Sequence, residues 1–200
     1  MKNGQEYIEC AILSIASFVT EIIIVDNESV DRTIEIVNDL KIRLENIVQI
    51  KLFKYSKKLE IAGEGYKDRV LKNPEASLSR FYDYCFSLAQ CGYLMKCDAH
   101  AIFTRKGINL LAGALKNEPD IISFRGSEIY GKQLNMETSL FKREQKFRFF
   151  DKERWEQLDF SSKDKLQLKE PFYLHVKGFP LLRIFTQMTY RQQEQNITYE

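Results

Sequence analysis

The chain has 200 residues, of which 44% are hydrophobic and 29% are charged, and this suits one soluble globular domain with a core of its own. Its formal net charge of +2 argues against a nucleic-acid partner, because nucleic-acid-binding domains carry a strong or clustered positive charge. We therefore expect residues 1–200 to form a single domain that binds no nucleic acid.

Cysteine usage and hydropathy favour a cytoplasmic location. The cysteines show no C-x-x-C spacing and no histidine cluster beside them, which argues against zinc. Cys85 and Cys97 lie in apolar patterns typical of small buried residues in a reducing compartment. The N-terminal stretch MKNGQEYIE lacks an apolar signal-peptide core, and no run approaches the roughly 20 apolar residues of a membrane span. We expect any membrane contact to be peripheral, at the inner face.

Helix and strand patterns alternate through the first 125 residues. Apolar residues spaced three or four apart predict helices, and short runs of aliphatic residues predict strands buried on both faces. Helices are predicted to begin near Glu6, Asp31, Ser77 and Lys106, and strands to cover residues 21–26, 47–53, 93–97 and 120–124. This alternation is typical of an open α/β sheet with right-handed crossovers.

The segments between these elements are polar. The stretch DNESVDRT follows the first strand, and Ser29 or Asp31 can cap the helix after it. Residues 54–73 are rich in lysine and glycine, and we expect a loop there. After Gly126 the chain becomes basic and aromatic, with short strand-like pieces and a polar tail.

Two acids follow predicted strands, at the sheet edge where open α/β proteins bind ligands. Asp26 follows EIIIV and Asp98 follows YLMKC. Either can accept hydrogen bonds from a ribose or a base, hold a divalent cation, or serve only as a turn former. His100 lies two residues after Asp98 and so points to the same side of an extended chain. Such a mixed oxygen and nitrogen pair suits Mn²⁺ better than Mg²⁺, although a surface histidine without a metal is the simpler interpretation.

Three stretches in this order resemble the family 2 glycosyltransferases. They are KNGQEYIECAILSI, EIIIVDNESVDRT and SLSRFYDYCFSLAQCGYLMKCDAH, and the similarity covers about residues 2–125. The resemblance implies the GT-A fold, a Rossmann-like open and mostly parallel sheet flanked by helices. It also implies a nucleotide-sugar-binding half, residues 2–125, and a smaller acceptor-side α+β half, residues 126–200.

The resemblance assigns roles to individual residues. Asp26 matches the acid that contacts the nucleobase or ribose, and Arg80 matches a basic residue facing the donor phosphates, to which a guanidinium binds in bidentate fashion. Asp98 matches the first acid of the D-x-D motif. His100 takes the place of the second acid, which removes a negative charge and is expected to weaken or change metal binding. Mn²⁺ or Mg²⁺ is the implied cofactor.

The start of the chain also departs from the family pattern. Family members have a hydrophobic strand just before the K-N-x-x-x-Y stretch, in the middle of the sheet, whereas Met1 directly precedes Lys2 here. Loss of that strand leaves backbone groups of its neighbour unpaired, which costs several kcal/mol. We therefore expect either a truncated start or a rebuilt sheet.

The second half of the chain supplies further candidate residues for binding the metal, the diphosphate or the acceptor. In PFYLHVKGF, Phe172 and Leu174 share one face and His175 and Lys177 the other. His175 resembles a late histidine that related transferases bring to the metal or diphosphate, and Lys177 is a candidate phosphate contact. A half-exposed strand histidine is the alternative. The stretch FKREQKFRFFDKERWEQL mixes cations with aromatic residues, which suits either an anionic or saccharide acceptor or a solvated strand and turn.

The sequence leads to one main hypothesis and two alternatives. The main hypothesis is a metal-assisted, inverting transfer of a sugar from a nucleotide donor to a saccharide, lipid-linked or cell-surface acceptor. Such a reaction needs a carboxylate base, for which Glu128 and Glu156 are the candidates. The alternatives are a sugar-phosphate nucleotidyltransferase, although its glycine- and arginine-rich phosphate loop is missing from MKNGQEY, and a degenerate transferase that binds without catalysis.

Overall fold

The computed structural model describes residues 1–129, 131–136, 138–162 and 164–176. The helices are α1 (Ile8–Ile15), α2 (Thr33–Arg43), α3 (Tyr66–Lys72), α4 (Leu78–Ser87) and α5 (Arg105–Leu115), with a short 3₁₀ helix at Pro74–Ala76. The strands are β1 (Glu21–Asp26), β2 (Gln49–Lys54), β3 (Tyr93–Met95), β4 (Ala101–Phe103), β5 (Ile121–Glu128), β6 (Thr138–Lys142), β7 (Phe147–Asp151), β8 (Glu156–Phe160) and β9 (Leu166–His175). The predicted α/β class is confirmed.

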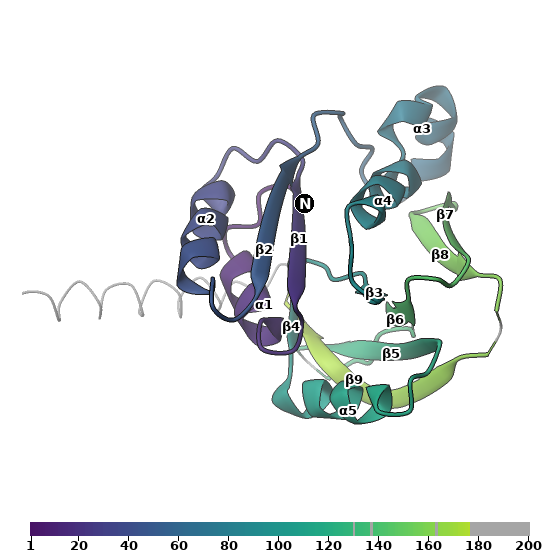
Figure 1. The fold of residues 1–200 in the computed structure, drawn as a ribbon. Helices are drawn as coiled ribbons and strands as arrows, with labels where there is room; N and C mark the ends of the chain where they lie inside the picture. Colours follow the sequence, from purple (N-terminus) through teal and green to yellow (C-terminus); the bar gives the residue numbers. More distant parts are fainter. Residues whose placement is uncertain (130, 137, 163, 177–200) are drawn as a thin grey trace, which may run out of the picture.

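The strands form three hydrogen-bonded groups (Figure 1). Strands β1 and β2 pair in parallel. A five-stranded sheet has the order β3-β6-β5-β9-β4, in which β5 and β9 are parallel and the other pairs antiparallel. Strands β7 and β8 form an antiparallel pair beside α4. Within the described part of the chain, no ladder joins β1 to β3.

The first core lies between α1, α2 and the β1–β2 pair. Ile8 and Ile12 lie one helical turn apart on α1, and Val37 and Leu40 lie together on α2, so each helix turns an apolar stripe inward. Ile24 of β1 is buried against these stripes. The strand pattern and both helix patterns are therefore confirmed by packing.

The second core lies where α5 covers the five-stranded sheet. Phe124 of β5 is fully buried and contacts Phe103 and Phe172 ring to ring. Gly107 permits α5 to approach β9 closely, because a Cβ there would lie 2.3 Å from the carbonyl oxygen of Phe172. Helix α5 begins with the side chain of Thr104 accepting a hydrogen bond from Gly107 N.

A third core is mainly aromatic and joins α4 to β6, β7 and β8. Phe86 stacks on Phe141 at 5.8 Å between centroids and also contacts Phe147 and Phe149. Phe147 and Phe149 thus pack inside the protein, which removes them as platforms for a sugar. In the same stretch, Trp155 is 43% exposed.

Two local predictions need correction. The polar segment 54–73 was expected to be a loop, but it contains α3, whose inner face is made by the buried Tyr66 and Val70. Two apolar residues in one short helix give too weak a pattern to detect. Cys97 was expected to be buried, but it is exposed because the chain leaves β3 at Met95. Of the two proposed caps for α2, Asp31 accepts a hydrogen bond from Thr33 N at 3.0 Å, whereas Ser29 accepts from Asn3 N.

Candidate functional site

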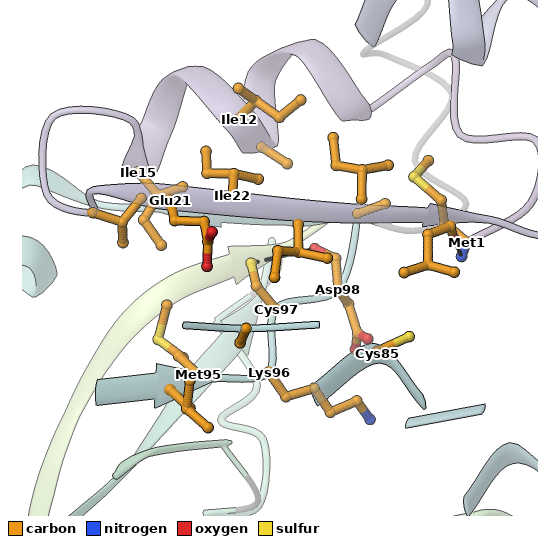
Figure 2. A pocket seen from close by; sticks show the side chains of 18 of the residues that line it. Met1, Ile12, Ile15, Glu21, Ile22, Cys85, Met95, Lys96, Cys97 and Asp98 are labelled. Carbon is orange, nitrogen blue, oxygen red and sulfur yellow. Dashed lines mark hydrogen bonds between the residues drawn. The ribbon is translucent and has the colours of Figure 1, made fainter. Parts of the chain in front are cut away.

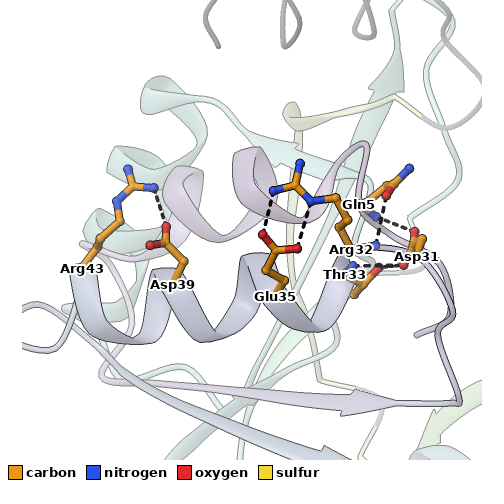
Figure 3. Close-up of polar contacts among 7 residues, drawn as sticks. All are labelled: Gln5, Asp31, Arg32, Thr33, Glu35, Asp39 and Arg43. Atoms are coloured by element: carbon orange, nitrogen blue, oxygen red, sulfur yellow. Dashed lines mark hydrogen bonds and ion pairs between the residues drawn. The ribbon is translucent and has the colours of Figure 1, made fainter. Parts of the chain in front are cut away.

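The loop before α1 and the loop after β1 are tied together by reciprocal hydrogen bonds. Gly4 N donates to Thr33 Oγ1 at 2.7 Å, and Gln5 N donates to Asp31 Oδ2 at 3.2 Å. In return, Arg32 N donates to Gln5 Oε1 at 3.1 Å (Figure 3). The hydrogen bonds to Asp31 outweigh its desolvation and hold the pKa of its carboxyl below the usual value. The two motifs quoted above, KNGQEY and DNESVDRT, therefore form one structural unit.

Asp26 lies at the carboxyl end of β1, inside this unit. The residue is only 5% exposed, and its Oδ2 accepts a hydrogen bond from Ser29 N at 3.1 Å. Its Oδ1 is buried and has no hydrogen-bond partner among the described residues. An acceptor left in that state costs about 1–3 kcal/mol, so Asp26 offers a ready acceptor for a donor group on a ligand.

The chain's first residue lies beside Asp26. The Met1 ammonium donates to Val25 O at 2.6 Å, and Asn27 N donates to Met1 O at 2.7 Å. These two bonds are the pattern of a parallel bridge between Met1 and Asp26. Burial lowers the pKa of the Met1 ammonium below its ordinary value, while nearby acidic groups, Asp26 and Asp98 among them, oppose the shift.

Asp98, His100, His175 and Glu128 form a chain of contacts at the other side of the site. His100 Nε2 lies 4.0 Å from Asp98 Oδ2, and the two imidazole rings meet edge to face at 4.5 Å between centroids. His175 Nδ1 lies 3.2 Å from Glu128 Oε1. The antiparallel register of β4 and β9, which pairs Ala101 with His175, brings these distant segments together.

These residue types suit a divalent cation that accepts both oxygen and nitrogen ligands. Carboxylate oxygens and imidazole nitrogens together are donors that Mn²⁺ accepts. In the described ranges, however, no three histidine, cysteine or acidic side chains are already gathered around one point. The donor set therefore fits a metal by chemistry, and its side chains must rotate to enclose one. Lys177 lies outside the described residues.

A partly buried ion pair stands close to Asp98. Lys96 Nζ lies 2.6 Å from Glu156 Oε1, and Glu156 is only 8% exposed. Lys96 also lies 4.2 Å from the ring centre of Tyr82. Burial opposes the charged form of Lys96, but the negative charges around it prevail and raise the pKa of its ammonium. Glu156 thus points at a fixed cation.

Arg80 occupies the exposed side of α4, where it pairs with Glu75, the same carboxylate that Lys57 contacts. The start of α4 is held from the other side by Asp151. The carboxylate of Asp151 accepts hydrogen bonds from Ser77 Oγ at 2.6 Å and from Ser79 Oγ at 2.9 Å.

A cavity of about 710 Å³ runs between β1 and the segment from β3 to His100. Figure 2 shows Met1 at one end of this space, β1 with Ile22 and Glu21 along one side, and Met95 and Asp98 across from them. Apart from its polar end near Asp98 and His100, the lining is mainly aliphatic and aromatic.

Comparisons with known proteins identify the family and the fold. The sequence pattern of the family described as "Glycosyl transferase family 2" matches residues 1–175. The chain belongs to glycosyl transferase family 2. Its fold is similar to that of S. aureus TarS, residues 1–349, with a TM-score of 0.53 and 12% sequence identity. The match covers 72% of this chain and 45% of the TarS chain, so the chain spans less than half of that relative. No curated protein sequence matches the chain.

Family membership and the structural similarity confirm the GT-A type of α/β fold. Of the predicted site residues, the structure brings Asp98, His100, His175 and Glu128 into one chain of contacts. It sets Arg80 and Glu156 in separate ion pairs. In the described part of the chain, no helix is long and apolar enough to cross a membrane.

Sequence reasoning missed two groups beside the site. Lys96 was passed over as part of an apolar strand, although a lone cation in the run YLMKC is itself a signal of a buried charge partner. Asp151 carries no local signal, because its partners Ser77 and Ser79 lie more than 70 residues earlier in the chain.

Proposed function

We propose that this family 2 glycosyltransferase binds a nucleotide-sugar donor between Asp26 and Asp98 and transfers the sugar to a saccharide or lipid-linked acceptor. The unpartnered Oδ1 of the buried Asp26 carries the proposal. A ribose hydroxyl or a base N–H would supply the missing hydrogen bond, and the exchange of an unsatisfied acceptor for a bonded one favours the bound state.

The diphosphate of the donor would lie toward Asp98. We propose that Asp98, His100 and His175 hold Mn²⁺ or Mg²⁺ there, because they supply one oxygen and two nitrogen donors within a continuous chain of contacts. A bound cation would offset the negative charge of the leaving diphosphate. Lys96, which stays charged close to Asp98, would add a fixed positive charge from the protein itself. Arg80 and Lys177 remain candidates for further phosphate contacts.

The acceptor hydroxyl must lose a proton during transfer, and Glu128 is the favoured base. Its carboxylate already contacts His175 and is partly exposed, with a side-chain exposure of 35%. Glu156 is the weaker candidate because it is buried and its oxygen faces the ammonium of Lys96. A carboxylate in such an ion pair is a poor proton acceptor.

Calorimetric titration tests the donor site. With Mn²⁺ present, we expect the chain to bind at least one of UDP, GDP, CDP and dTDP. Asp26→Asn and Asp98→Asn should each weaken that binding about tenfold or more, which corresponds to about 1.4 kcal/mol. Asp39→Asn is the matched control, since Asp39 is an exposed carboxylate on α2 that pairs with Arg43. Equal binding by all three variants would contradict the assignment of the site.

A second function has two observations in its favour. His100 stands where the family pattern has an acid, and no three-donor cluster is preformed within the described ranges. A transferase fold that binds a nucleotide without turning it over would account for both. Nucleotide binding together with no donor hydrolysis and no transfer, over a panel of sugar nucleotides, would favour this binding role.

A further inference from the structure

The antiparallel pair β7–β8 has one face turned to the protein and one face turned to solvent. Side chains alternate along both strands, so that Phe149 of β7 and Glu156 and Phe160 of β8 are buried. The positions between them, such as Arg148 and Gln157, are exposed. We call this solvent-facing side the outer strip, and it consists of Arg148, Phe150, Lys152, Trp155, Gln157 and Asp159.

Two cations of the outer strip are held against one aromatic ring. The guanidinium carbon of Arg148 lies 5.5 Å from the ring centre of Phe150, and Lys152 Nζ lies 5.4 Å from it. Such contacts orient a cation without neutralising its charge. Arg148 and Lys152 are four residues apart, which is about 13 Å along an extended strand. Two separated charges favour a ligand with several negative groups over a single small anion.

Trp155 gives the outer strip a flat apolar platform. It is the one tryptophan of the sequence and is 43% exposed. It lies across the turn from Lys152, whose N–H donates to Trp155 O at 2.8 Å. A pyranose ring has a face of C–H groups that packs on an indole, while its hydroxyls need hydrogen-bond partners. Gln157 and Asp159 supply such partners, and the strand register places Gln157 opposite Phe150.

The mixture of groups on this face separates a saccharide from other anionic partners. A nucleic acid or an anionic membrane favours uninterrupted positive charge, whereas Asp159 lies among the cations here, 3.8 Å from Arg148. A carboxylate repels phosphates but accepts hydrogen bonds from sugar hydroxyls. Both side chains of this pair are more than half exposed, so water screens the pair and Arg148 stays able to bind an anion.

We propose that the outer strip of β7–β8 binds an anionic oligosaccharide, with a pyranose ring on Trp155 and acid groups at Arg148 and Lys152. This rests on the proposed transfer to a saccharide acceptor and names the class of that acceptor. On the opposite face of β8, Glu156 pairs with Lys96, which lines the cavity. The outer strip therefore lies outside the transfer site and holds a part of the acceptor remote from the reacting hydroxyl.

The single tryptophan makes this binding directly observable. Titration of the full chain with hexagalacturonate, without nucleotide or metal, should give a saturable change in Trp155 emission and should reduce its quenching by acrylamide. Raising NaCl from about 20 mM to about 200 mM should weaken the binding several-fold, because the charged contacts are exposed. Maltohexaose has sugar rings without charge and hexaglutamate has charge without sugar rings, so each should bind about tenfold more weakly or worse.

Matched variants separate the outer strip from the rest of the surface. Combining Arg148→Gln with Lys152→Gln should weaken hexagalacturonate binding about tenfold. Combining Lys41→Gln with Lys116→Gln, which changes two exposed lysines elsewhere, should leave the binding as in wild type. Trp155→Ala, followed by calorimetry, should abolish the binding, and circular dichroism checks that each variant is folded.

Three results would overturn the proposal. They are no saturable signal with hexagalacturonate, equal binding by the two double variants, and binding of maltohexaose or hexaglutamate as tight as that of hexagalacturonate. The donor site is tested separately, because Asp26→Asn should weaken nucleotide binding and leave hexagalacturonate binding unchanged. A failure of the outer strip and a failure of the donor site are therefore distinguishable.

Discussion

Strands β1 and β5 both contribute apolar side chains to the core, but their surroundings differ. Ile24 and Val25 of β1 are buried, as are Ile121, Ile122 and Phe124 of β5. Strand β5 is paired on both edges, with β6 and with β9. Among the described residues, strand β1 is paired only with β2 (Figure 1), apart from the bridge to Met1. Its other edge faces a cavity of about 710 Å³.

The difference shows that hydrophobic pattern and edge pairing are separate properties. An apolar run requires cover above and below the sheet, and α1 and α4 provide residues that cover β1. It does not require a neighbour on each side within the sheet. The candidate donor site lies at Asp26, at the end of this incompletely paired strand. How rigidly the unpaired edge of β1 is held therefore affects the proposed donor binding.

A matched pair of core substitutions should show the largest effect. We expect Ile122→Ala, in the fully buried centre of β5, to lower the free energy of unfolding by about 4 kcal/mol. Ile24→Ala in β1 should cost about 2 kcal/mol, because residues beside a cavity can shift to fill the space. Urea unfolding followed by circular dichroism measures both. Equal costs would mean that β1 is packed as tightly as β5.

Breaking the Lys96–Glu156 pair should have the next largest effect, on the β3 side of the cavity. Lys96→Met leaves the buried carboxylate of Glu156 without its cation, and we expect a loss of about 3 kcal/mol. The double variant with Glu156→Gln removes the stranded charge and should recover most of that loss. Chemical unfolding of the single and double variants gives the comparison. If both single and double variants are as stable as wild type, the pair does not hold β3 in place.

The Asp151 contacts should matter less and should depend on pH. Burial acts to raise the pKa of this carboxyl, but hydrogen bonds from Ser77, Tyr66 and Ser79 prevail and lower it. Because the folded pKa lies below the unfolded value of about 3.9, the stabilisation is fully present above that value and is lost as pH falls through the folded pKa. Asp151→Asn should cost about 1–2 kcal/mol at pH 7.

Thermal unfolding from pH 7 down to pH 2 measures this dependence. The difference between wild type and Asp151→Asn should shrink once the pH drops below about 4. Asp39→Asn, on the exposed face of α2, supplies the control for a general charge effect. If the stability difference between wild type and Asp151→Asn stays constant with pH, the asparagine destabilises the protein through its shape and hydrogen bonding and not through the loss of the charge.

The sequence was sufficient for the fold class and for most elements of the first 125 residues, because those elements carry strong period-2 or period-3.6 patterns. The sequence also proposed Asp98, His100, His175 and Glu128 as site residues. The structure brings these four together through the β4–β9 register and the Glu128–His175 contact, and their role in a site stays a prediction. Helix α3 escaped because only Tyr66 and Val70 mark its inner face.

The remaining features depend on contacts that no local pattern encodes. The pairing of Lys96 with Glu156 spans 60 residues. The unpaired edge of β1 is different, because the departure from the family pattern before Lys2 already led to the expectation of an unpaired neighbouring strand. Among the described residues, no ladder joins β1 to β3.

Native-state hydrogen exchange of the ligand-free chain tests this comparison most directly. Gln49 N donates to Thr20 O and Tyr55 N donates to Asp26 O, so in the alternating bonding of a parallel ladder the even-numbered residues of β1 bond to β2. The amides of Ile23 and Val25 should therefore exchange faster than those of Ile22 and Ile24. In β5, neighbouring amides from Ile122 to Phe124 should be protected alike, since both edges are paired. Uniform protection along β1 would contradict the difference between the two strands.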